Sequence, residues 1–210
     1  MTLIPRTIVH YGRYDPRTHT GGVETFARNL GLAFEEVVFM TPETRDEKLV
    51  LQKRWPVLCD NQHVLDWPEP IPVIGFQHGV ALRKLLSIPT WDHARLAFRQ
   101  FRASRRPHTL WVACAAWIRD TFARLYGCRA EHIVYHAVDL ERFDGRLDNA
   151  GSRLVLHDGR TPHKGRDLYP HLMKALPDYD FEELSCPAEQ VPERMRKARA
   201  FVHLSLYEGN

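Results

Sequence analysis

Residues 71–79 read IPVIGFQHG, a short apolar run that ends in the polar pair Gln77 and His78. An apolar run of this length, bounded by turn-forming residues, predicts a strand that is buried on both faces. Its polar carboxyl end is informative because parallel α/β sheets bind their ligands just beyond that end of the strands. The stretch therefore predicts a parallel sheet and also the side of the sheet on which a site lies.

The same alternation of strands and helices continues on both sides of this stretch. Strands are predicted at residues 7–12, 37–40, 109–115 and 132–139, and helices at residues 21–34, 80–106 and 117–127. Residues 55–60 (WPVLCD) and 63–67 (HVLDW) are further possible strands. This βαβα order predicts an α/β protein with a parallel sheet that helices cover on both faces.

A second βα series follows a small, polar stretch at residues 144–152. We place a linker at residues 146–152, between an N-terminal domain at 1–145 and a second domain at 153–210. Within the second domain, strands are predicted at 153–159, 179–184 and 200–206, and helices at 165–176 and 191–198. Both domains are expected to be Rossmann-like.

Composition excludes several classes of function. A formal net charge of +3 is too small for nucleic acid to be a bulk electrostatic partner. The four cysteines form no C-x-x-C pair and the twelve histidines no H-E-x-x-H motif, which argues against a metal site and favours reduced thiols in the cytoplasm. No apolar stretch reaches the length of a signal peptide or a membrane span, so any membrane contact is expected to be peripheral.

Two glycine-rich loops carry the strongest indications of anion binding. Arg160 and Lys164 lie between a predicted strand and helix, flanked by glycines that let backbone N–H groups approach an anion. Two cations there fit a diphosphate better than a single carboxylate, although a solvated turn is an equal alternative. Gly21 and Gly22 stand at the start of the first predicted helix, where they can also let backbone N–H groups approach an anion. The alternative is that the helix start needs glycine for its backbone conformation alone.

Two further polar residues follow predicted strands. His78 ends the strand at 71–79 on the ligand side, where a histidine more often caps or packs than reacts. Glu208 follows the last predicted strand, where its carboxylate can accept hydrogen bonds from sugar hydroxyls or sit near a helix N-terminus.

A basic stripe lies within the predicted helical region at 80–106. Arg95, Arg99, Arg102 and Arg106 are spaced at i, i+4, i+7 and i+11, beside an apolar stripe that includes Phe98. Such a helix can lie on an anionic membrane surface, and a solvated face beside a core face explains the spacing equally well.

The order of these segments resembles retaining GT-B glycosyltransferases of glycosyltransferase family 4. The segments that carry the resemblance are GGVETFARNL, GFQHGV, WVACAAWIRDTFARLYG, YHAVDLERF, DGRTPHKGRDL and AFVHLSLYEGN, and they extend over essentially the whole chain. GRTPHKG is similar to the family's G-R-x-x-x-x-K-G donor loop, AVDLERF to its interdomain N-G-V-D-x-x-x-F segment, and SLYEG to the start of its E-x7-E motif.

The resemblance implies an enzyme, a retaining hexosyltransferase with two Rossmann-like domains, of the kind that builds polysaccharides. A UDP- or GDP-linked sugar would bind the second domain, and a glycan or lipid-linked acceptor the first. Arg160 and Lys164 would neutralise the donor diphosphate, with Gly21 and Gly22 approaching it from the first domain. His78 and Glu208 would be the catalytic residues beside the transferred sugar, and no metal or other cofactor would be needed.

The chain departs from the family's pattern at three places. Cys114-Ala115-Ala116 stands where the family often has Ser, and His136-Ala137 stands in place of the usual Asn-Gly. The sequence also ends before the second glutamate of E-x7-E, so we expect a C-terminally truncated second domain and little transfer by these 210 residues alone.

Two other functions are compatible with the same residues. A GT-B-like nucleotide-sugar epimerase would change the donor without an acceptor, and a non-catalytic nucleotide- or glycan-binding module would bind without turnover. A dinucleotide-dependent oxidoreductase is disfavoured, because no G-x-G-x-x-G follows the first predicted strand.

Overall fold

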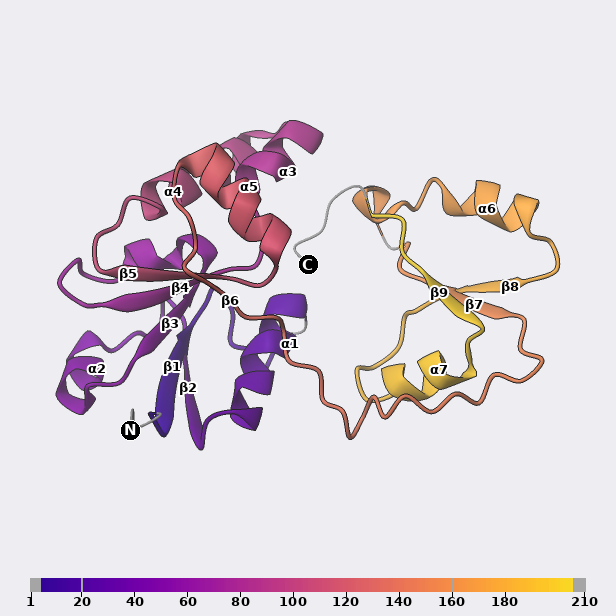
Figure 1. Cartoon of the computed structure of the whole chain (residues 1–210), viewed down its shortest axis with the longest axis horizontal. Helices are drawn as coiled ribbons and strands as arrows, with labels where there is room; N and C mark the ends of the chain where they lie inside the picture. The colour runs from indigo at the N-terminus through magenta and orange to yellow at the C-terminus, as the bar shows by residue number, and fades with distance from the viewer. Residues whose placement is uncertain (1–4, 20, 160, 206–210) are drawn as a thin grey trace. The chain divides into compact units, whose positions relative to one another are not determined.

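The computed structural model describes residues 5–19, 21–159 and 161–205. The chain forms two compact units, one up to Ala137 and one from Val138 onward, and each is described by itself (Figure 1). Both units combine a parallel sheet with helices, so the prediction of an α/β protein with two parallel sheets is confirmed.

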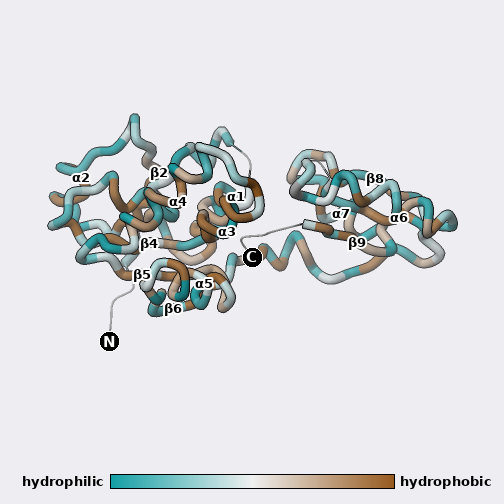
Figure 2. Tube along the Cα trace, turned by 90° about the horizontal axis from the view of Figure 1, so that it is seen from above, coloured by the Kyte–Doolittle hydropathy of each residue, from teal (hydrophilic) through white to brown (hydrophobic). Residues whose placement is uncertain are grey.

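The first unit is built on a six-stranded parallel sheet with the order β2-β1-β3-β4-β5-β6. Its strands are β1 (Thr7–Tyr11), β2 (Glu36–Met40), β3 (Val57–Asp60), β4 (Val73–Gln77), β5 (Thr109–Ala113) and β6 (His132–Ile133). The central strands are the apolar runs of the sequence, and Figure 2 colours β4 and β5 mostly as apolar. Because β3 lies between β1 and β4, the carboxyl ends of these three strands are neighbours.

Helices cover both faces of this sheet. They are α1 (Gly22–Asn29), α2 (Glu47–Lys53), α3 (Ala81–Ser87), α4 (Trp91–Ala103) and α5 (Ala116–Tyr126), with short 3₁₀ helices η1 (Leu30–Leu32) and η2 (Asn61–Asp66). Phe76 packs its ring against Phe26 of α1, with the ring centroids 4.4 Å apart. The next residue, Gln77, points to the opposite face and accepts a hydrogen bond from Gln100 of α4, and α3, α4 and α5 are grouped there (Figure 1).

Three sequence predictions in the first unit differ from the structure. The strand predicted at 132–139 is only His132–Ile133. Residues 63–67 belong to the 3₁₀ helix η2 and the turn after it instead of a strand, whereas Val57–Asp60 does form one. The helical region at 80–106 is two helices, because Pro89 disfavours helical geometry at the residue before it and cannot donate a backbone hydrogen bond. The second helix restarts at Thr90, whose side chain accepts a hydrogen bond from the backbone N–H of His93 at 3.2 Å.

Arg106 also differs from the expectation of an exposed arginine stripe. Its side chain is buried at the end of α4 and donates hydrogen bonds to the carbonyl oxygens of Pro68 and Ile71, each at 2.8 Å. Burial lowers the pKa of its guanidinium, and the two carbonyl oxygens pair with the terminal N–H groups, whereas the buried Nε has no hydrogen-bond partner in the described structure. Arg106 therefore fixes the loop before β4 and is not available to a membrane.

The second unit contains a three-stranded parallel sheet with the order β8-β7-β9. Its strands are β7 (Leu154–His157), β8 (Asp180–Glu183) and β9 (Ala200–Val202), joined through η3 (Pro162–Lys164), α6 (Tyr169–Ala175) and α7 (Val191–Lys197). The helices α6 and α7 lie on opposite sides of the sheet (Figure 1). This arrangement is compatible with a Rossmann-like fold.

The helix predicted at 165–176 begins later than expected, at Tyr169. Gly165 adopts the left-handed conformation with φ of 79° and ends η3, so the chain makes a turn before α6 starts. Pro170 occupies the first turn of α6, as predicted from its fixed φ.

No helix in the described part of the chain is long and apolar enough to cross a membrane. The four cysteines all lie in the described part of the chain and form no disulfide bond there.

Candidate functional site

His78 lies immediately after β4 and is almost completely buried. Its Nε2 is 2.9 Å from Oδ1 of Asp60, the last residue of the neighbouring strand β3. His10, from β1 on the other side of β3, approaches the same oxygen with its Nε2 at 3.1 Å. Three adjacent parallel strands thus bring two imidazoles to one buried carboxylate at the carboxyl edge of the sheet.

The carboxylate of Asp60 is held in its ionised form. Burial alone would raise its pKa, but the charges and hydrogen bonds of His10 and His78 outweigh burial and hold the pKa well below its usual range. Because an ionised carboxylate only accepts, both imidazoles donate from Nε2. The buried Nδ1 of His10 has no hydrogen-bond partner in the described structure.

His136 extends this cluster toward the surface. Its Nε2 is 3.0 Å from Nδ1 of His78, and the ring of Phe26 lies beside both imidazoles, with centroids 4.9 and 5.0 Å away. Burial and the positive charge of His78 lower the pKa of His136 to about 4, so it is neutral at pH 7. Exposure increases from Asp60 through His78 to the half-buried His136, so a ligand at this edge meets His136 first.

Acidification is expected to destabilise the first unit through His136. An unfolded imidazole takes up a proton near pH 6.5, whereas the folded one resists until about pH 4. The contribution of neutral His136 to the free energy of unfolding is therefore fully present above pH 6.5 and is lost as the pH falls to 4. It amounts to at most about 3 kcal/mol. Urea unfolding followed by tryptophan fluorescence measures it, because all five tryptophans precede Val138.

His136→Asn is the matched variant for this measurement, because asparagine keeps a hydrogen-bond donor but does not titrate. The free energy of unfolding of the variant should depend less on pH between 6.5 and 4 than that of the parent. Parallel pH profiles would show that His136 ionises as freely in the folded protein as in the unfolded one.

The backbone around His78 is fixed by two amide side chains. Asn61, at a positive φ of 46°, accepts a hydrogen bond from the backbone N–H of His78 at 3.0 Å. Gln100, buried in α4, donates to the carbonyl oxygen of Gly79 at 2.8 Å and accepts from the N–H of Ala81 at 2.7 Å. The loop that carries His78 is therefore held from both sides without the help of a ligand.

A cavity of about 1210 Å³ lies beyond the carboxyl ends of β1, β2 and β3. Its lining carries both signs of charge, and Asp66 links three of the groups that line it. This carboxylate is 2.8 Å from Nδ1 of His63, 3.3 Å from the hydroxyl of Tyr11 and 3.3 Å from Arg99. The mixture of donors, acceptors and aromatic rings suits a polyhydroxylated ligand better than a simple anion. Arg99 also contributes to this cluster instead of lying free on the outer face of α4.

Gly21 and Gly22 mark the start of α1, as predicted. Gly21 is the residue before the helix, with an extended φ of 173° that any residue adopts, and Gly22 is the first helical residue. A Cβ atom built on Gly22 would have no neighbour within 4 Å. Neither backbone strain nor packing against the described residues therefore requires glycine at position 22.

Gly22→Ala is expected to leave the free energy of unfolding unchanged or to raise it by up to about 1 kcal/mol, because alanine is the better helix former. If a phosphate approaches the helix there, the affinity of the chain for inorganic pyrophosphate should fall at least tenfold. Gly31→Ala is the matched control, because its Cβ also meets open space. Equal affinities of both variants would remove Gly22 from the site.

In the second unit, Lys164 ends η3, in the loop after β7. Its Nζ is 3.5 Å from Oδ2 of Asp158, and Nδ1 of His203 is 3.9 Å from the same oxygen. Asp158 follows β7 and His203 follows β9, so this second polar cluster also lies at the carboxyl ends of parallel strands. The sequence did not predict the pairing of Lys164 with Asp158, and an anion there would compete with this carboxylate.

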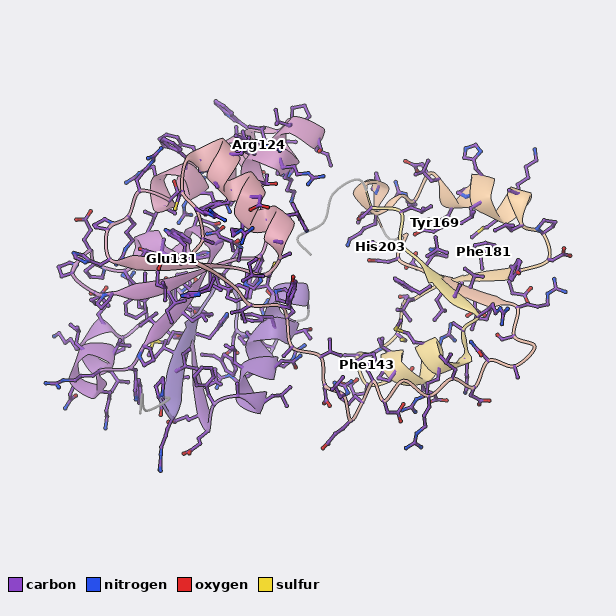
Figure 3. All side chains as sticks on the ribbon, viewed as in Figure 1. Arg124, Glu131, Phe143, Tyr169, Phe181 and His203 are labelled. Carbon is purple, nitrogen blue, oxygen red and sulfur yellow. The ribbon has the colours of Figure 1, made fainter. Side chains whose placement is uncertain are left out.

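Tyr169 of α6 packs against the ends of β7 and β9, and Figure 3 labels it together with His203 of the cluster. Its ring stacks on His157 with centroids 4.2 Å apart, and its hydroxyl donates to the carbonyl oxygen of Val202 at 3.0 Å. A Cβ on Gly159 would lie 2.7 Å from the Tyr169 ring, so packing alone requires this glycine. Two of the residues predicted for the site, Arg160 and Glu208, lie outside the described residues.

Sequence reasoning identified His78 but missed Asp60, His10 and His136. His10 lies in β1, Asp60 ends β3, and His136 lies three residues after β6 of the same sheet. This closeness to a strand is the only sequence signal that they share. In the described part of the chain, no three His, Cys, Asp or Glu side chains are arranged to hold a metal ion.

The two polar clusters carry the functional argument without support from known proteins. No protein-family model matches the chain, and no curated protein is significantly similar to it.

Proposed function

We propose that the chain is a retaining glycosyltransferase of the GT-B type, which moves a sugar from a nucleotide-diphosphate donor to a glycan or lipid-linked acceptor. The observation that carries the proposal is the pair of polar clusters around His78 and Lys164. Each cluster lies at the carboxyl edge of its own parallel sheet, the edge at which such sheets bind ligands. The donor would bind the second unit, and the acceptor the cavity of the first.

The chemistry of transfer matches the residue types in these clusters. Breaking the anomeric C–O bond builds negative charge on the departing diphosphate and positive charge on the sugar. Lys164, together with Arg160 of the same loop, would stabilise the negative charge on the diphosphate. This stabilisation would grow as the bond breaks, because the charge on the diphosphate increases. Lys164 would have to exchange Asp158 for the phosphate, which makes binding of the donor a competition between two anions.

His78 would orient the transferred sugar instead of acting as a free base. Both of its ring nitrogens already have partners, Asp60 and His136, within the first unit. A substrate hydroxyl can therefore bond to His78 only by displacing His136. Otherwise it would bond to His136, which in turn contacts His78. The neutral state of His136 suits it to accept or donate one hydrogen bond to a sugar hydroxyl without adding charge beside the reacting carbon.

A screen of UDP- and GDP-linked sugars with the full gene product tests this proposal. We expect transfer to a glycan or lipid-linked acceptor with retained anomeric configuration, and at least a hundredfold loss in Arg160→Ala and Lys164→Ala. Product analysis without acceptor separates transfer from epimerisation of the donor. Transfer that survives both substitutions would mean that the donor loop is misassigned.

A further inference from the structure

The outer face of α4 exposes large apolar side chains that a solvated helix would place inward. Trp91 is 89% exposed and Phe98 is 61% exposed, and Leu86 of the adjacent helix α3 is 74% exposed. The inward face of α4 consists of Ala97, Gln100 and Ala103, which are buried against the rest of the first unit. The apolar stripe predicted to face the core thus faces outward at Phe98.

Arginines alternate with the aromatic residues along this face. Trp91, Arg95, Phe98 and Arg102 follow one another at i, i+4, i+7 and i+11, which is one side of α4, and Arg105 lies in the turn just after the helix. All five are exposed, and the guanidinium of Arg105 lies over the ring of Phe101, 5.2 Å from its centroid, close enough for a cation–π contact. We call these five residues the α4 face.

The charge around the α4 face is strongly one-sided. Residues 81–106 contain seven basic residues and a single acidic one, Asp92, which gives a local net charge of +6 (7 − 1) in a chain whose total is +3. Arg106 is engaged with carbonyl oxygens, Arg99 with Asp66, and Arg83 lies over the ring of Trp117. Arg95, which also lines the cavity, and Arg102 and Arg105 are exposed, and α3 and α4 pack against each other (Figure 1).

We propose that the α4 face docks on an anionic lipid surface, with Trp91 and Phe98 inserted at the level of the headgroups and the arginines bound to lipid phosphates. The charge favours this occupant, because acidic headgroups form a continuous negative plane that complements a one-sided basic helix. Tryptophan suits the interface since its ring is apolar and its indole N–H polar. The small inward residues let α4 lie close to the sheet while its large side chains remain outside.

Vesicle flotation tests this docking on the intact chain. We expect binding to vesicles of phosphatidylcholine with about 30 mol % phosphatidylglycerol, and at least tenfold weaker binding to phosphatidylcholine alone. Arg95→Gln with Arg102→Gln should weaken the binding about 25-fold, at about fivefold for each arginine. Trp91→Ala with Phe98→Ala should weaken it at least tenfold. Because all four side chains are exposed, these variants should keep the fold, which circular dichroism checks.

The matched control is Leu51→Ala with Lys53→Gln, which removes one exposed apolar and one basic side chain from α2 and should leave flotation unchanged. Absence of binding to the acidic vesicles at low salt would overturn the proposal. Equal losses in the α4 and α2 variants would overturn it too. A change of oligomeric state in Trp91→Ala, seen by sedimentation velocity, would instead assign the α4 face to a contact between two copies of the chain.

Discussion

Asp60→Ala is expected to lower the free energy of unfolding of the first unit by about 3–5 kcal/mol. The substitution leaves the Nε2–H groups of His10 and His78 without their shared acceptor in a buried environment, and each unpaired donor costs about 1–3 kcal/mol. Such a loss is a large part of the marginal stability of a typical domain, about 5–15 kcal/mol. Urea unfolding followed by tryptophan fluorescence gives the value for this unit.

The matched control is Asp120→Ala, which removes a carboxylate of the same kind from an exposed pair. Its Oδ1 is 2.9 Å from Nε of Arg119 on the surface of α5, where solvent screens the interaction, so the free energy of unfolding should hardly change. Similar losses for the two variants would show that the histidine cluster contributes no more than a surface contact. If Asp60→Ala does not fold, Asp60→Asn retains an acceptor oxygen and should show a smaller loss in the same assay.

Lys164→Ala is expected to weaken the binding of UDP or GDP by about 10- to 100-fold, because a charge-assisted contact to phosphate contributes about 1.5–3 kcal/mol. Asp158→Asn should have the opposite effect, since it removes the carboxylate that competes with phosphate for the ammonium group 3.5 Å away. Isothermal titration calorimetry on the intact chain measures both affinities and does not require turnover.

Lys174→Ala is the control for this pair, because it removes an exposed lysine from α6 of the same unit. Its affinity for the nucleotide should equal that of the parent. Unchanged affinity in Lys164→Ala would show that the loop after β7 is a solvated turn, the alternative that its sequence left open.

The central strands of the first unit were predictable because they are short apolar runs between turn-forming residues, whereas β8 (DFEE) is mostly charged. β4 is the clearest case, and its polar carboxyl end is sufficient to single out His78 from the sequence. The split between α3 and α4 required weighing Pro89 against an otherwise helical pattern. Residues 63–67 (HVLDW) show that a short stretch with apolar residues also fits a 3₁₀ helix and the bend after it.

The histidine cluster could not be predicted in the same way. Asp60 joins His10 and His78 only because β3 lies between β1 and β4, and the order of strands in a sheet is a property of tertiary packing. His136 stands where the resemblance leads one to expect asparagine, and the structure gives that substitution a role as the hydrogen-bond partner of His78. The chemistry of Lys164 was predicted from its loop, but its partner Asp158 was not, although it lies only six residues earlier.

Comparing a nucleoside diphosphate with its monophosphate tests most directly whether this chain holds a leaving pyrophosphate. In calorimetric titrations of the intact chain, UDP or GDP should bind at least tenfold more tightly than UMP or GMP, and raising the salt concentration should reduce that difference. Equal affinities for the two, or no binding of either, would contradict a donor diphosphate site at Lys164 and with it the proposed transfer reaction.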